Sequence, residues 1–121
     1  MQTRIIEPVR GMRLSFREAT VFILNTLDQQ VNVDILGGID PELSINSIIK
    51  SSLVDSNSSK VIPLSHSDGW LPFVSCELKC STQPTTGKVT VWVVRSKFEI
   101  SKIFDGEIRD TESHRGSLAE W

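Results

Sequence analysis

The sequence lacks several features that would assign it to a common class of protein. It has no excess of positive charge, since its 121 residues carry a formal net charge of −2, and we therefore predict no nucleic-acid partner. Its longest apolar runs are a handful of residues, whereas a membrane-spanning helix needs about 20, so no membrane partner is predicted. The N-terminal stretch MQTRIIEPVR has no apolar signal-peptide segment, which predicts a protein made in the cytoplasm.

The common catalytic motifs are also missing. The chain has no P-loop, no G-x-G-x-x-G, no H-E-x-x-H and no G-x-S-x-G. His66, Ser67 and Asp68 supply the residue types of a catalytic triad, but adjacent residues cannot converge as a triad requires. A small enzyme with two carboxylates in a cleft stays open, because the sequence alone does not exclude it. We predict that the protein is not an enzyme and has no cofactor.

Cysteine is scarce, and its spacing limits what the two copies can do. Cys76 and Cys80 lie four residues apart in an alternating run, so on a strand their Cα atoms stand ~13 Å apart at ~3.3 Å per residue. A disulfide needs less than about 7 Å. A zinc site would need two further ligands, and the chain offers only His66 and His114. We therefore predict no metal site, and two reduced, buried thiols that act as small apolar residues.

What is present is mainly a pattern of short strands with turn signals between them. The predicted strands are residues 12–16, 20–26, 31–36, 61–64, 73–80, 88–94 and 97–104. Residues 20–26 and 31–36 are expected to form one antiparallel hairpin, and residues 73–94 another. After Thr90 the strand is apolar on both faces, which predicts a central strand covered on both sides, whereas Pro63 predicts an edge strand.

These strands predict an all-β fold. Asp40 followed by Pro41 is a helix-start signal, so at most one short helix is expected near residues 41–51. About seven to eight short strands with regular turns predict an antiparallel β-sandwich of jelly-roll type.

The charges divide the chain into three predicted parts. Residues 1–11 form a basic arm, residues 12–104 the β-sandwich domain and residues 105–121 an acidic tail. Arg4, Arg10 and Arg13 are candidate partner contacts in the basic part, because arms of opposite sign attract one another between neighbouring subunits. Two solvated termini are the alternative interpretation.

Two of the three tryptophans are candidate binding residues. Trp121 ends a polar tail and could fill a pocket on a neighbouring molecule. Trp70 lies in a loop after a turn and could stack on a sugar ring, in a carbohydrate- or ligand-binding module. The alternative is that Trp70 caps the core while Trp92 is buried in the sheet, and the absence of tyrosine favours this alternative.

Two segments together resemble a known group of proteins. NTLDQQVNVDILGGID (residues 25–40) and GWLPFVSCELKCSTQPTTGKVTVWVV (residues 69–94) are similar to small β-sandwich virion proteins of tailed bacteriophages. The resemblance covers about half of the chain and lies in turns and strands. It implies a capsid decoration protein or a head or tail accessory subunit, located in the virion and made in the host cytoplasm. The implied partners are copies of itself, a capsid protein or a tail protein, and no catalytic residues are implied.

Overall fold

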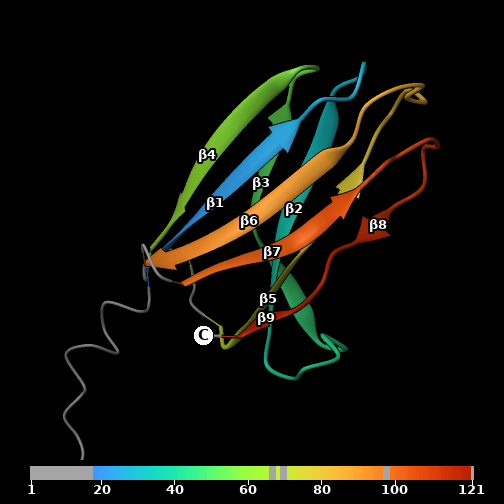
Figure 1. The fold of residues 1–121 in the computed structure, drawn as a ribbon. Coiled ribbons are helices and arrows are strands. Elements are labelled where there is room, and N and C mark those ends of the chain that lie inside the picture. Colours follow the sequence, from blue (N-terminus) through green and yellow to red (C-terminus); the bar gives the residue numbers. More distant parts are fainter. Residues whose placement is uncertain (1–17, 66–67, 69–70, 97–98, 121) are drawn as a thin grey trace, which may run out of the picture.

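The structure, a computed structural model, describes residues 18–65, 68, 71–96 and 99–120. This part of the chain forms nine β-strands and no α-helix (Figure 1). The strands are β1 (Ala19–Asn25), β2 (Val31–Gly38), β3 (Asn46–Val54), β4 (Ser58–Leu64), β5 (Phe73–Lys79), β6 (Val89–Ser96), β7 (Glu99–Gly106), β8 (His114–Arg115) and β9 (Ala119–Glu120). The predicted arm over residues 1–11 and the predicted strand over residues 12–16 lie outside the described residues.

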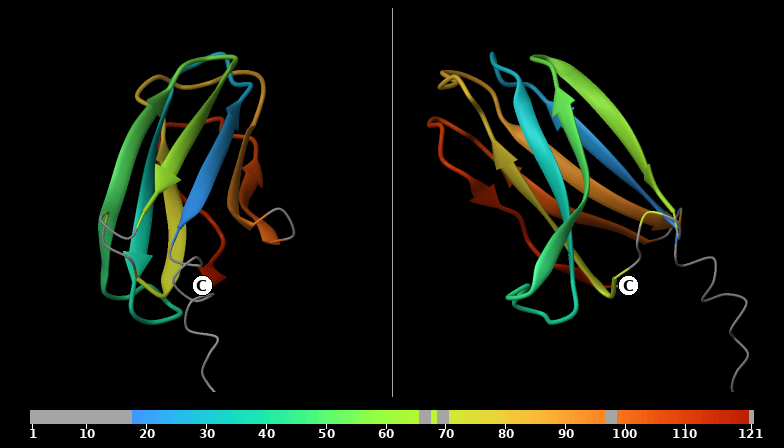
Figure 2. Two further views of the ribbon diagram at one scale, coloured as in Figure 1. Left: turned by 90° about the vertical axis from the view of Figure 1, so that its left-hand side faces the viewer. Right: turned by 180° about the vertical axis from the view of Figure 1, so that it is seen from behind.

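The strands form two antiparallel sheets that pack against each other as a β-sandwich (Figure 2). The four-stranded sheet has the order β4-β1-β6-β7, and the five-stranded sheet has the order β3-β2-β5-β8, with β9 also paired to β5. The all-β sandwich prediction is confirmed. Strand β6 lies between β1 and β7, and Pro63 lies on the edge strand β4, as predicted.

Both predicted hairpins are wrong, because the chain crosses to the other sheet at each of those loops. Strand β1 pairs with β4 and β6, whereas β2 pairs with β3 and β5. Strands β5 and β6 likewise lie in opposite sheets, and the real hairpins are β2–β3 and β6–β7. Alternation shows which residues of a strand face the core, but it carries no information about the partner strand.

The inward-facing side chains of both sheets form one core. Its fully buried members include Val21, Ile23, Leu27, Val31, Val33, Ile35, Val74, Leu78, Val89, Val91 and Ile108. Cys76 and Cys80 belong to the same core, and both are buried and free. Burial raises the pKa of Cys76 to about 12, so its thiol stays protonated at neutral pH and is a poor nucleophile.

No helix forms near residues 41–51, where β3 begins at Asn46 instead. The Asp40 carboxylate accepts a hydrogen bond from the N–H of Ser44 (3.1 Å), but the chain then turns through Leu43 at a φ of 52°. Strand β3 pairs with β2 through a β-bulge opposite Ile35 and Leu36. A capping residue therefore closes a turn here, because pairing with β2 outweighs a weak local helix signal.

The segment predicted as an acidic tail, residues 105–121, belongs to the sandwich as far as residue 120. Strand β7 runs on to Gly106, and both β8 and β9 pair with β5. Ile108 is fully buried in the core. The N–H of Gly116 donates to the carbonyl of Cys76 (2.8 Å), and the N–H of Ser117 donates to the carbonyl of Ile103. The segment thus joins the two sheets along one side of the sandwich.

At one end of the sandwich, the loop after β1 is bonded to the loop before β6. The Asp28 carboxylate accepts hydrogen bonds from the N–H of Thr85 (3.0 Å) and from its hydroxyl. Gly87 has a φ of 91°, and a Cβ at this position would lie 1.9 Å from the Thr26 carbonyl oxygen. Asn25 is fully buried, and its side-chain amide donates hydrogen bonds to three main-chain carbonyls beside these loops. The motif residues NTLD and PTTG therefore hold the two loops together.

Candidate functional site

The four-stranded sheet carries apolar side chains on its outer face as well as on its inner face. On β1, Val21 and Ile23 are fully buried, so their neighbours Phe22 and Leu24 point outward. An antiparallel sheet with one solvated face normally has polar residues there. We call this outer surface the apolar face, and it comprises Phe22, Leu24, Val61, Trp92, Val94 and Ile100.

Strand register brings these residues together. Phe22 lies directly opposite Val61 of β4 on one side and Trp92 of β6 on the other, and Val94 lies opposite Ile100 of β7. Directly opposed residues share one face of a sheet. The apolar face therefore crosses all four strands, which Figure 1 shows side by side.

An aromatic pair lies at the centre of the apolar face. The rings of Phe22 and Trp92 are 5.5 Å apart between centroids and inclined by 35°. Together with Val94 and Ile100 they line a shallow cleft of about 280 Å³. Val61 and Ile100 are 59% and 57% exposed, so the cleft has an open aliphatic margin on both sides.

Charged residues lie at the margin of the apolar face. Asp105 accepts hydrogen bonds from Thr90 (3.1 Å) and forms ion pairs with Lys88 (3.1 Å) and Lys102 (3.3 Å). These contacts, with that of Lys88 the largest, lower the pKa of Asp105. Its carboxylate is thus ionised at neutral pH and already bonded. The margin is polar while the centre is apolar, which is the usual anatomy of a protein–protein contact.

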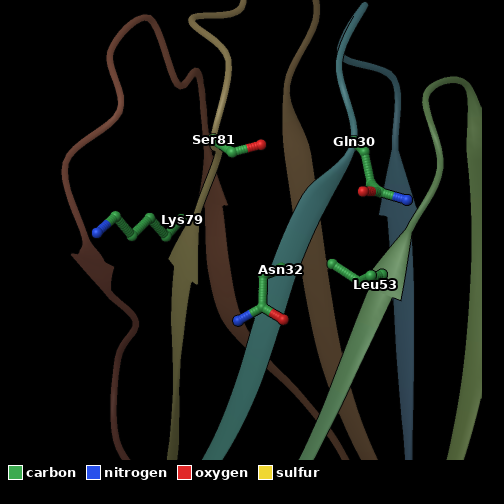
Figure 3. Close-up of a pocket in the computed structure, with 5 residues that line it drawn as sticks. All are labelled: Gln30, Asn32, Leu53, Lys79 and Ser81. Atoms are coloured by element: carbon green, nitrogen blue, oxygen red, sulfur yellow. The ribbon is translucent and has the colours of Figure 1, made fainter.

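A second hollow lies on the outer face of the five-stranded sheet (Figure 3). It has a volume of about 210 Å³ and is lined by Gln30, Asn32, Leu53, Lys79 and Ser81. Gln30 donates to the Asp55 carboxylate (2.9 Å), and Leu53 is 55% exposed. Figure 3 shows Lys79 extending away from the other four side chains. The hollow combines hydrogen-bonding groups with one apolar side chain, but it is shallow and open.

The residues proposed from sequence as binding residues lie outside the described part of the chain. These are Arg4, Arg10, Arg13, Trp70 and Trp121.

The groups considered for catalysis have structural partners where they are described. His66 and Ser67 also lie outside the described residues, whereas Asp68 accepts a hydrogen bond from the Ser65 N–H (2.7 Å) and pairs with Lys50. His114 pairs with Asp110 (2.8 Å). Among the residues described, no three metal-binding side chains come together.

Sequence reasoning missed the apolar face, although one signal for it was present. Residues after Thr90 are apolar on both sides of the strand, and this pattern predicted a strand covered on both faces. Strand β6 is central in its sheet, but Trp92 and Val94 are half-buried on the outer face rather than enclosed. Trp92 is therefore a surface residue, and the expectation of a tryptophan buried in the sheet is wrong.

Fold and surface together define a class: an antiparallel two-sheet β-sandwich with an exposed apolar sheet face. Comparisons with protein families, with curated proteins and with solved structures find no match to this chain. In the described part of the chain, no helix is both long and apolar enough to cross a membrane.

Proposed function

We propose that this chain is a non-enzymatic structural protein of a phage-type particle, a capsid decoration protein or a head or tail accessory subunit. It acts through contacts between subunits, with copies of itself or with a capsid or tail protein as partners, and it resides in the virion. The observation that carries this proposal is the apolar face. A sheet face with an aromatic pair at its centre, aliphatic residues beside it and charged residues on its edge strand, with Lys102 opposite Trp92, is suited to contact with another protein.

The sequence supports the particular kind of structural protein. The two segments that resemble phage virion proteins, residues 25–40 and 69–94, contain the motif residues that bond the β1–β2 loop to the β5–β6 loop. Such a pair of loops stiffens one end of the sandwich without supplying any reactive group. A stiff sandwich that presents an apolar face suits a subunit that binds a particle surface.

Particle association tests the proposal. Particles are purified on a density gradient from cultures of the organism that carries the gene, and this chain is quantified in them by mass spectrometry. We expect to find the chain in the particle fraction. In a Val61→Lys variant the amount of chain in that fraction should fall at least tenfold, because a buried unpaired charge weakens such a contact by about 1.4 kcal/mol or more. Leu53→Lys is the matched control, since Leu53 is similarly exposed but lies on the other sheet. Absence of the wild-type chain from purified particles contradicts the proposal.

A carbohydrate- or ligand-binding module is the second candidate function. The hollow in Figure 3 supports it, because amides beside an exposed apolar side chain are groups that recognise sugars. A glycan array with the wild type, Asn32→Ala and Trp70→Ala tests both sites. A glycan signal that either substitution abolishes favours this function, and no signal from the wild type removes it.

A further inference from the structure

The connection between β2 and β3 presents a group of isoleucines to solvent. Ile39 and Ile45 lie just beyond the last residue pair of this hairpin and are 61% and 68% exposed, and Ile48 on β3 is 58% exposed. We call residues 39–48 the isoleucine tip. Three large apolar side chains exposed within ten residues are more than the scattered exposure of an ordinary surface, and such a group marks a site of contact.

The isoleucine tip has a fixed shape. The N–H of Leu43 donates to the carbonyl of Asp40 (3.0 Å), and the side-chain amide of Asn46 donates to the carbonyl of Leu43. Leu43 has a φ of 52° and is buried, and it packs so closely against Gly38 that a Cβ there would clash with it. A residue other than glycine keeps this conformation only where its surroundings hold it. The tip thus turns one leucine inward and is held with its isoleucines exposed.

The isoleucine tip and the cleft of the apolar face belong to different parts of the sandwich. Figures 1 and 2 show the β2–β3 connection at the end of the sandwich away from the β1–β2 and β5–β6 loops. The tip extends from the five-stranded sheet, whereas the cleft lies on the outer face of the four-stranded sheet. The sandwich therefore keeps the tip away from its own cleft, and these two surfaces can meet only between copies.

The two surfaces also differ in charge. Residues 38–49 contain Asp40 and Glu42 but no lysine or arginine, a net charge of −2. The strands of the four-stranded sheet carry Lys60, Arg95 and Lys102 against Glu99 and Asp105, a net charge of +1, and Glu18 and Lys88 beside these strands cancel each other. Lys102 lies directly opposite Trp92, next to the cleft. The tip is therefore attracted to the sheet that bears the cleft, whereas two copies of that sheet repel each other.

We infer that the isoleucine tip of one copy of this chain inserts into the apolar cleft of the next copy. This inference rests on the proposed function, in which the apolar face contacts another subunit. The contact covers both exposed apolar surfaces at once, whereas two apolar faces stacked on each other would leave the tip in solvent. Because each copy joins its neighbours through two different surfaces, the contact is heterologous and repeats from copy to copy into a ring or a chain.

Mixing two lysine variants tests the inference by sedimentation velocity. Ile45→Lys alters the tip and leaves the cleft intact, whereas Ile100→Lys alters the cleft and leaves the tip intact. Both positions are more than half exposed, so each variant is expected to fold, and far-UV circular dichroism checks this. We expect each variant alone to sediment as the 13.5 kDa monomer at a concentration where the wild type forms larger species. Their mixture should form a one-to-one dimer and nothing larger, because one intact tip and one intact cleft remain.

Leu53→Lys is the matched control, since Leu53 is similarly exposed but belongs to neither surface. It should assemble as the wild type does. A one-to-one dimer from two monomeric variants supports contact between tip and cleft. If Ile45→Lys assembles like the wild type, if the mixture stays monomeric, or if Leu53→Lys dissociates equally, the inference is wrong.

The results also separate this inference from the proposed function. A wild type that stays monomeric at every concentration overturns contact between tip and cleft, yet the proposed function stands if the chain is found in purified particles. A dimer from the mixed variants supports contact between tip and cleft even if the chain is absent from particles, and in that case the proposed function is the one that fails.

Discussion

At the scale of single residues, Gly87 shows how closely the loops at one end of the sandwich approach each other. Its φ of 91° lies in the left-handed region, and a Cβ there would meet the Thr26 carbonyl oxygen at 1.9 Å. Only glycine satisfies both conditions without moving the main chain. The PTTGKV motif therefore specifies a close contact between the loop before β6 and the loop after β1, two strands that pair in the same sheet.

Gly87→Ala should destabilise the protein by about 2 kcal/mol or more, because it adds both left-handed strain and a clash with main-chain atoms. Gly106→Ala is the matched control, since its Cβ would meet only the Phe104 ring at 3.8 Å, an ordinary contact distance. Urea denaturation of the two variants and the wild type measures the difference. Equal unfolding midpoints for both glycine variants would contradict this role of Gly87.

Sequence reasoning predicted the state of the cysteines but not the role of the motif residues. Cys76 and Cys80 were correctly predicted as buried and unbridged, because strand geometry alone keeps them too far apart for a disulfide. The bond between Asp28 and Thr85 joins residues 57 positions apart. The local pattern of apolar and polar residues contains no information about such a contact, because the contact depends on which sheet each strand joins.

At the scale of the elements, several connections are held by ionised carboxylates. The pKa values of Asp28, Asp68 and Asp105 all lie below their ordinary value of 3.8. The main cause is the hydroxyl of Thr85 for Asp28, the N–H of Ser65 for Asp68 and the ammonium of Lys88 for Asp105. Each group favours the ionised form in the folded state only.

Stability should therefore fall in acid. A carboxyl with a lower pKa in the folded state stabilises the fold fully above its unfolded value, 3.8. That contribution is lost as the pH falls through 3.8 toward the lower folded value, because the unfolded chain then binds more protons. We expect the urea midpoint to decrease between about pH 5 and pH 2, and to decrease less in Asp28→Asn. A midpoint that does not change over this range, or an identical decrease in the variant, would contradict this explanation.

The strands themselves were largely predictable, whereas their partners were not. Runs 20–26, 31–36, 61–64, 73–80 and 88–94 all correspond to observed strands. The helix-start signal at Asp40 does not lead to a helix, because the same hydrogen bond from Ser44 to Asp40 also closes a turn. Residues 46–54 lack clear alternation because the bulge opposite Ile35 and Leu36 shifts the register midway along β3.

At the scale of the whole molecule, the hardest feature to predict from the sequence was which segments and side chains are buried and which are exposed. The polar composition of residues 105–121 suggested a tail, yet Ile108 and the bonds at Gly116 tie this segment to both sheets. Trp92, which points outward beside Phe22, was expected to be buried in the sheet. The described chain provides no layer over these two residues, and this is the reason why we propose contact between subunits at the apolar face.

Sedimentation velocity of the purified full chain tests most directly whether the apolar face joins subunits. The wild type should sediment as a species larger than the 13.5 kDa monomer, with a share that rises with concentration. Ile100→Lys, at a position 57% exposed, should shift the protein to the monomer, whereas Leu53→Lys should behave as the wild type. A wild type that stays monomeric at every concentration, or equal dissociation of the two lysine variants, would contradict contact between copies of this chain through the apolar face.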